Sequence, residues 1–246
     1  MRGENNWIAA DWPAPDNVFA GTTLRFGGVS TGAFESLNLG AHVSDDKGAV
    51  DTNRRRFTSF CELPSEPIWL RQVHGKTVVV NPAAGIIPEA DASITRTAGV
   101  VCAVLTADCL PVLFTSADGA ELAAVHAGWR GLASGVLEAT VDEMSTAPAN
   151  ILAWLGPAIS QPAFEVGGEV REEFLAQDPI ADQHFVTNDR GRWQADLYGL
   201  ARMRLKGLGI GHICGGQHCS FSESERFFSY RRDGACGRMA SFVFRR

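Results

Sequence analysis

Between residues 100 and 155 the chain alternates short apolar segments with turns, and this pattern limits the folds open to it. Residues 100–106 and 111–115 are apolar and rich in β-branched side chains, Asp118-Gly119 marks a turn, and residues 121–126 form a third segment. Segments of this length and composition predict strands. We therefore expect a group of neighbouring buried strands in the middle of the chain.

Helical patterns follow and flank these strands. Apolar side chains between residues 129 and 144 recur with helical spacing, so the strand that ends at His126 is expected to lead directly into a helix. Other helices are expected from about residue 49 to 63, over residues 167–176, and after Asp196, which suits an N-cap.

The remaining strand signals are shorter and more scattered. Further strands are expected at residues 69–73, 77–80, 151–155, 227–230 and 241–244. Because strands and helices mix without strict alternation, the expected fold class is α+β, a layered fold with mixed sheets. The length of 246 residues suits one large domain or two small ones.

Charge and hydropathy exclude several classes of protein. The formal net charge is -6, from 28 acidic and 22 basic residues, which argues against a nucleic-acid binder because such proteins carry a basic surplus. The longest apolar run, residues 98–107, is too short to span a bilayer. The N-terminal residues do not resemble a signal peptide, so we expect a cytoplasmic protein whose six cysteines are reduced.

Three residues that can bind a metal lie where strands are expected to end. Cys109 follows residues 100–106, His126 ends the next strand but one, and His74 follows residues 69–73 beside Gly75. Zn²⁺ binds Cys and His readily, and three protein ligands leave a fourth position for water or substrate. A catalytic zinc site at His74, Cys109 and His126 is one interpretation of this pattern.

The same residues allow other interpretations. In a cysteine hydrolase, Cys109 would be the nucleophile and His126 the base that forms its thiolate. A lone Cys or His is also commonly a packed or hydrogen-bonded residue without a reaction to perform. Sequence chemistry alone does not separate these alternatives.

Arginines near these positions are candidates for binding an anion. In the segment His126-Ala127-Gly128-Trp129-Arg130-Gly131, the expected helix start and Arg130 could contact a phosphate group. Arg54 is a second candidate, and Arg226, Arg231, Arg232 and Arg238 form a basic patch near the C-terminus. A further group, His212, Cys214, His218 and Cys219, matches no common zinc module and is interpreted as strand and turn residues.

Taken together, the motifs resemble the YfiH-type family, also called laccase-domain or polyphenol-oxidase-like proteins and later viewed as purine nucleoside phosphorylases. The resemblance rests on an ordered set of segments that covers residues 21–242. These are GGVSTGAFESLNLGAHVSDD, Asn53-Arg54, Gln72-Val73-His74-Gly75, Ala90-Asp91-Ala92, Ala107-Asp108-Cys109-Leu110-Pro111, the segment 126–131, Leu155-Gly156-Pro157-Ala158-Ile159, FFSYRRDG and Gly237-Arg238.

The resemblance implies a fold, a metal site and an activity. It implies one domain over residues 1–246, with an α/β/β/α layering related to the cytotoxic necrotizing factor-type deamidases. It implies that His74, Cys109 and His126 bind Zn²⁺ and are the catalytic residues. For phosphorolysis, Arg130 and Arg54 are our own candidate contacts for phosphate. The implied reactions are phosphorolysis of adenosine, inosine and S-methyl-5′-thioadenosine, and deamination of adenosine. The expected partners are a small-molecule purine nucleoside and phosphate, with a homodimer allowed and neither nucleic acid nor a membrane expected.

The older laccase label conflicts with the composition. A multicopper oxidase needs many histidines, commonly in His-x-His pairs, whereas this chain has six histidines and no such pair. Copper-dependent polyphenol oxidase activity is therefore kept only as an alternative, although Cu²⁺ would bind a Cys/His site tightly.

Overall fold

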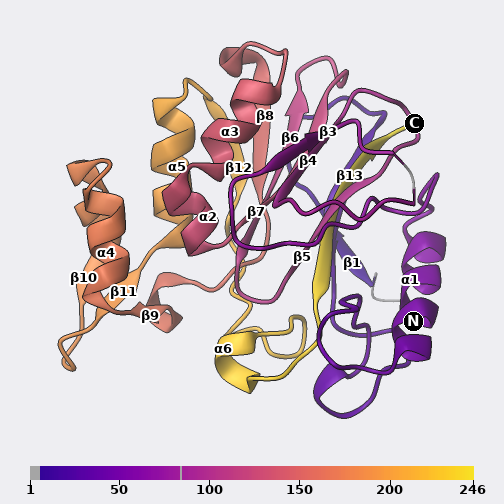
Figure 1. Ribbon diagram of the computed structural model, residues 1–246, viewed down its shortest axis with the longest axis horizontal. Helices are drawn as coiled ribbons and strands as arrows, with labels where there is room; N and C mark the ends of the chain where they lie inside the picture. Colours follow the sequence, from indigo (N-terminus) through magenta and orange to yellow (C-terminus); the bar gives the residue numbers. More distant parts are fainter. Residues whose placement is uncertain (1–5, 84) are drawn as a thin grey trace.

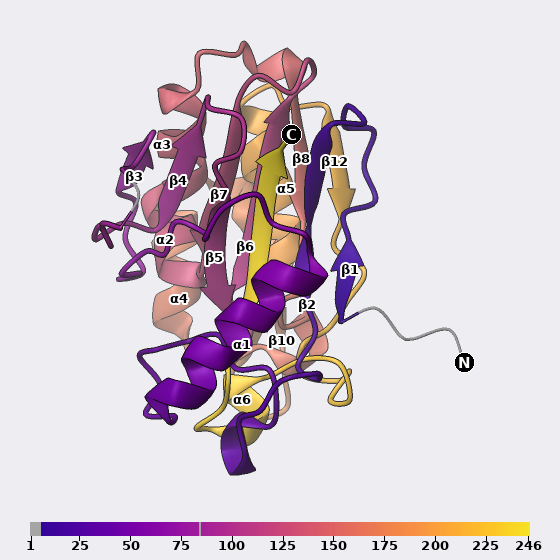
Figure 2. The ribbon, with the colours of Figure 1, turned by 90° about the vertical axis from the view of Figure 1, so that its right-hand side faces the viewer.

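The computed structural model describes residues 6–83 and 85–246, which form two packed sheets with helices outside them (Figures 1 and 2). One sheet has the strand order β1-β2-β13-β5 and the other the order β12-β8-β6-β7-β4-β3. A small third sheet, β10-β11-β9, stands apart from these two. The fold is therefore a mixed α/β fold with several sheets, as the sequence predicted.

The strands and helices have the following bounds. The strands are β1 (Trp7–Ala9), β2 (Val18–Thr23), β3 (Val78–Val80), β4 (Ala92–Thr95), β5 (Cys102–Thr106), β6 (Leu110–Ser116), β7 (Leu122–Ala127), β8 (Ile151–Leu155), β9 (Glu165–Val166), β10 (Phe185–Thr187), β11 (Trp193–Ala195), β12 (His212–Gly215) and β13 (Met239–Arg245). The α-helices are α1 (Lys47–Phe60), α2 (Trp129–Ser134), α3 (Val136–Glu143), α4 (Gly168–Leu175), α5 (Leu197–Gly207) and α6 (Tyr230–Asp233).

The central strand of the six-stranded sheet is β6, which pairs antiparallel with both β7 and β8. The outer pairs β12–β8 and β3–β4 are parallel, so the sheet is mixed. All residues of β6, β7 and β8 are buried, which explains why their sequences read as nearly continuous apolar runs. The strands that the sequence predicted here are confirmed.

Three apolar clusters hold the layers together. One lies between the sheets and includes Val104 of β5 and Leu113 of β6. A second joins the six-stranded sheet to helices α2 to α5. A third joins the four-stranded sheet to α1, which crosses its outer face (Figure 2). No helix in the described part of the chain has the length and apolar character needed to cross a membrane.

Three local predictions are wrong. Residues 69–73 form no strand; an isolated bridge joins Arg71 to Glu89, and the side chain of Gln72 forms hydrogen bonds with both the N–H and the carbonyl oxygen of Leu105. Residues 227–229 form a buried loop, and exposed Tyr230 begins α6. The helix predicted from 129 to 144 is divided into α2 and α3 at Gly135, whose φ of +92° leaves the right-handed helical region.

Replacing Phe57 by Ala should lower the free energy of unfolding by about 3–5 kcal/mol, because truncating a large buried side chain leaves a cavity. Phe57 is fully buried between α1 and the four-stranded sheet, with its ring centroid 5.2 Å from that of Phe242. Urea denaturation measures the change. The control, Arg55→Ala on the exposed side of the same helix, should change stability by no more than about 0.5 kcal/mol. Equal losses in the two variants would contradict this packing.

Candidate metal centre

His74, Cys109 and His126, which are far apart in the sequence, meet at one point of the structure. Their possible ligand atoms all lie within 4.8 Å of one another, with 3.9 Å between Cys109 Sγ and His74 Nε2. The two imidazole rings lie 4.8 Å apart, nearly perpendicular to each other. Within residues 6–83 and 85–246, this is the one group of three or more His, Cys, Asp or Glu side chains arranged to hold an ion.

Each ligand is positioned by a different element. His126 lies on β7 and is almost fully buried. Cys109 is half-buried in the turn that carries the chain from β5 in one sheet to β6 in the other, after Asp108 with φ of +88°. His74 lies in a loop rather than at a strand end and has φ of +62°. Such a φ is uncommon for a residue other than glycine, so the loop must be held by other contacts.

Asp91 provides those contacts and lies just before β4, fully buried. Its Oδ2 accepts hydrogen bonds from the backbone N–H groups of Gly75 at 2.7 Å and Val73 at 3.2 Å. Its Oδ1 accepts the N–H of His74 at 2.9 Å and is 2.8 Å from Nδ1 of His126. Burial acts to raise the pKa of Asp91, but these bonds outweigh it and hold the pKa below its usual value.

The contact from Asp91 selects the atom through which His126 can bind a metal. A proton on Nδ1 is donated to the carboxylate, which leaves Nε2 directed away from Asp91. Metal-binding histidines are commonly oriented in this way by a carboxylate behind them. Sequence analysis missed this role, because Asp91 appeared there only as part of a family motif.

Gly128, the N-cap residue of α2, makes room for two of the ligands. A Cβ at this position would lie 2.9 Å from Cys109 Sγ and 3.2 Å from the His74 ring. A Cβ on Gly131 would lie 2.9 Å from the carbonyl oxygen of Gly75. The two glycines of this segment therefore allow α2 to pack directly against the ligands and their loop.

The charges of Cys109 and His126 stabilise one another. Burial acts to raise the pKa of the Cys109 thiol, but His126 and His74 outweigh it and lower that pKa to about 6. Burial acts to lower the pKa of His126, while the charge of Cys109 and the bond to Asp91 raise it to about 9. Near neutral pH the thiolate is therefore the favoured form of Cys109, and a thiolate is the form that binds a metal or acts as a nucleophile.

This donor set fits a zinc ion. Zn²⁺ binds Cys sulfur at about 2.3 Å and His nitrogen at about 2.0–2.1 Å, so a tetrahedral ion holds its donor atoms roughly 3.5 Å apart. The three donor atoms lie within 4.8 Å of one another and would move closer together to bind an ion. A set of three protein ligands is typical of a catalytic zinc site, whereas structural sites commonly use four.

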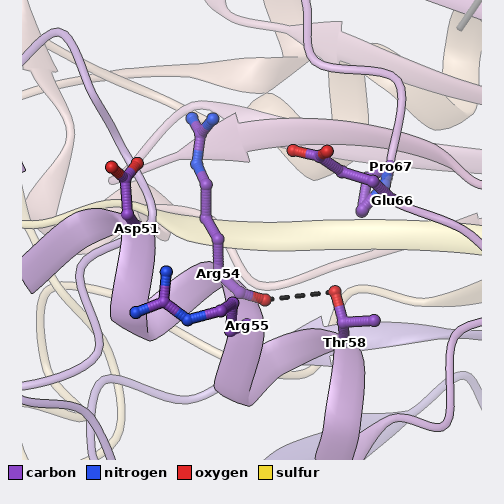
Figure 3. Close-up of a pocket in the computed structure, with 6 residues that line it drawn as sticks. All are labelled: Asp51, Arg54, Arg55, Thr58, Glu66 and Pro67. Carbon is purple, nitrogen blue, oxygen red and sulfur yellow. Dashed lines mark hydrogen bonds between the residues drawn. The ribbon is translucent and has the colours of Figure 1, made fainter. Parts of the chain in front are cut away.

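The two arginines predicted to contact phosphate line different hollows. Arg54 lines a cavity of about 440 Å³ with Asp51, Arg55, Thr58, Glu66 and Pro67 (Figure 3). Arg130 is exposed, with its guanidinium 4.4 Å from the centroid of the Trp129 ring, in a separate hollow of about 280 Å³ that also holds Arg231. The structure therefore brings the three ligands together but not these two arginines.

Other polar residues have structural partners. The carboxylate of Asp108 accepts bonds from the Ser220 hydroxyl at 2.6 Å and from the backbone N–H of Arg231 at 2.7 Å. His218 lies 3.1 Å from Glu223, and Cys219 lies 2.9 Å from the Ser160 hydroxyl. His212 and Cys214 lie on β12, which pairs with β8. The interpretation of the cluster at 212–219 as strand and turn residues agrees with these contacts.

Comparison with known proteins places the chain in a family. Residues 19–246 match the sequence model of a family described as multi-copper polyphenol oxidoreductase laccase, and the chain belongs to this family. Within it, the chain is of the YfiH type. It is 53% identical over 240 residues to the purine nucleoside phosphorylase YfiH of Escherichia coli, a match that covers 96% of this chain and 98% of that protein.

Solved structures of relatives have the same fold. A Neisseria meningitidis protein of the family DUF152 superimposes with a TM-score of 0.94 at 51% identity, over 98% of this chain and 99% of that one. YlmD from Geobacillus stearothermophilus superimposes with a TM-score of 0.93 at 31% identity, over 100% of this chain and 98% of that one. The mixed α/β arrangement is therefore shared across these relatives.

Asp91→Asn should weaken metal binding by about 10- to 100-fold, because an amide has a single acceptor oxygen and no charge to hold His126 and the loop of His74. Competition with a chromophoric zinc chelator measures the affinity. Asp142→Asn, an exposed change on α3, should leave zinc affinity unchanged. If Asp91→Asn binds zinc as tightly as the unaltered protein, the carboxylate does not support the site.

Proposed function

We propose that this chain is a zinc-dependent purine nucleoside phosphorylase that acts on adenosine, inosine and S-methyl-5′-thioadenosine and also deaminates adenosine. The observation that carries the proposal is the His74/Cys109/His126 cluster supported by buried Asp91. Its occurrence in a chain 53% identical to a protein named purine nucleoside phosphorylase adds support.

Phosphorolysis sets clear requirements for the site. An oxygen of phosphate forms a bond to the ribose C1′ while the C1′–N9 bond breaks, and the purine leaves with the electron pair and takes up a proton. The sugar becomes positively charged as the bond breaks, so negative charge close to it is stabilising. Zn²⁺, when bound by the three ligands, would supply a localised positive charge able to orient substrate oxygen or nitrogen atoms.

The chain's own residues have distinct tasks in this proposal. Cys109 and His126 would hold the ion, and Asp91 keeps the His126 ring in the required orientation. His74 completes the set from a loop that the same carboxylate fixes. Arg54 and Arg130 are the candidate contacts for phosphate, and the nucleoside lies over the three ligands.

A cysteine amidohydrolase is the alternative function that a specific observation favours. The mutual stabilisation of the Cys109 thiolate and protonated His126 is what such an enzyme needs before it attacks a carbonyl carbon. A relation of the fold to the cytotoxic necrotizing factor-type deamidases is part of this alternative. Copper-dependent polyphenol oxidase activity is a weaker alternative that the description of the matched family suggests. Cu²⁺ would suit the same ligands.

The proposal extends to the setting of the protein. We place the enzyme in the cytoplasm, as one domain over residues 1–246, with a purine nucleoside and phosphate as its small-molecule partners. A homodimer fits this setting, whereas nucleic acid and membranes are not proposed as partners. The acidic net charge of -6 supports the exclusion of nucleic acid.

Zinc-loaded protein incubated with adenosine and phosphate should release adenine and ribose 1-phosphate, with inosine formed beside them. Chromatography of the mixture measures all of these products. Cys109→Ala should abolish both metal loading and turnover while circular dichroism shows an intact fold. Unchanged turnover in that variant would exclude the proposed metal site.

Metal removal separates the two functions. A chelator should stop phosphorolysis and added Zn²⁺ should restore it, whereas a cysteine amidohydrolase would keep its activity without metal and lose it on thiol alkylation. Cys61, which is buried and whose pKa burial raises, should not react with the alkylating reagent. Nucleoside left intact under all of these conditions would argue for the hydrolase alternative.

A further inference from the structure

The four arginines of the C-terminal basic patch have different surroundings. Arg226 pairs with Glu223 and Arg232 with Asp233. Arg231 is exposed and donates to the carbonyl oxygen of Glu165. The fourth, Arg238, is half-buried, and its guanidinium donates to the carbonyl oxygens of Cys236 at 2.8 Å and Gly237 at 3.0 Å. In the described residues it makes no ion pair.

Arg54 on α1, like Arg238, bonds to a backbone carbonyl oxygen and forms no ion pair within the described residues. Its Nε donates to the carbonyl oxygen of Leu39 at 3.1 Å, and its guanidinium lies 4.0 Å from the centroid of the Trp69 ring. Figure 3 shows this guanidinium extended away from Arg55 and Thr58. Its terminal N–H groups form no hydrogen bond within the described residues, and the carboxylates of Asp51 and Glu66 line the same cavity.

One loop joins these two arginines. Leu39, whose carbonyl accepts from Arg54, also donates its N–H to the carbonyl oxygen of Arg238 at 3.1 Å. The N–H of Arg238 donates to the side chain of Asn38 at 2.9 Å. A Cβ on Gly40 would lie 2.8 Å from Arg238 Cγ, so glycine lets the loop lie against that side chain. The loop then continues to His42.

Both arginines are also connected to the metal centre. The Arg238 guanidinium lies 6.0 Å from the centroid of the Tyr230 ring. The backbone N–H of Arg231, which follows Tyr230, donates to Asp108, the neighbour of Cys109. The ring of Trp69, beneath Arg54, belongs to the segment that leads to His74. Burial lowers the pKa of His42, and so do the positive charges of Arg238, Arg54, His126 and His74. The charges of the two arginines and of the two metal-centre histidines therefore act on His42.

We propose that Arg54, His42 and Arg238 form the binding site of the phosphate that phosphorolysis consumes. This inference rests on the proposed function and selects between its two phosphate contacts. Guanidinium groups bind phosphate oxygens through paired N–H bonds. Here two of them lie against the same loop and form no ion pair within the described residues, although Asp51 and Glu66 line the cavity beside Arg54. Arg130, in contrast, is exposed and lies in a separate hollow, which holds Glu165 and Glu169 together with Arg192 and Arg231.

The test compares Arg54→Gln and Arg238→Gln with the unaltered, zinc-loaded full chain. Two quantities are measured for each: the KM for phosphate at saturating adenosine, and the Kd for inorganic phosphate by calorimetry. Each variant should raise both by about 10-fold or more, since each loses a charged hydrogen bond to the anion. The KM for adenosine and the zinc content should not change. Arg54→Lys and Arg238→Lys should recover part of the affinity.

Two further variants serve as comparisons. Arg55→Gln, an exposed neighbour of Arg54 that bonds to Thr52, should leave both quantities as they are. Arg130→Gln tests the other hollow, and a rise in phosphate KM there, without one in the Arg54 and Arg238 variants, would overturn the proposal.

The failure of this inference differs from the failure of the proposed function. Phosphate binding that depends on Arg54 and Arg238, without release of free base from any nucleoside, would refute the phosphorylase activity and support the phosphate site. Release of base with an unaltered phosphate KM in both variants would refute the phosphate site and support the phosphorylase activity. Absence of both phosphate binding and base release would reject the two together.

Discussion

The carboxylate of Asp91 is the contact on which the arrangement of the centre depends. One buried side chain accepts three backbone N–H groups from the loop of His74 and orients the ring of His126. Removing it would leave those three N–H groups without their acceptor in the protein. The positive φ of His74 persists because these bonds hold it. Two of the three ligands are thus fixed by a residue that does not itself belong to the ligand set.

The third ligand is fixed by the topology of the sheets. Cys109 lies where the chain leaves β5 in the four-stranded sheet and enters β6 in the six-stranded sheet. The apolar cluster between the sheets sets the distance between those strands, and Gly128 allows α2 to begin against the sulfur atom. A disturbance of the layer packing would therefore move Cys109 relative to His126, even though neither residue contributes much to the core.

Local patterns in the sequence predicted what local interactions determine. The buried strands β5 to β8 were recognisable because both their faces are covered. His74, Cys109 and His126 were candidate ligands because Cys and His side chains can bind a metal. Contacts between distant residues were not predictable in this way. Asp91 bonds partners 16 to 35 positions away, and residues 69–73 have strand-like composition but bond through a side chain. Likewise, Arg238 differs from Arg226 and Arg232 only in what the fold places beside it.

Charge balance connects the metal centre with the proposed phosphate site. The Cys109 thiolate and the Asp91 carboxylate supply two negative charges, which offset a divalent ion bound between His74 and His126. The loaded centre would then be close to neutral and would not offset the charges of Arg54 and Arg238. Phosphate groups carry about 1.5 to 2 negative charges at neutral pH, which matches the two charges of Arg54 and Arg238. Without the metal, protonated His126 offsets only one of these two negative charges, so loading of the metal centre would remove one net negative charge and should favour binding of the anion.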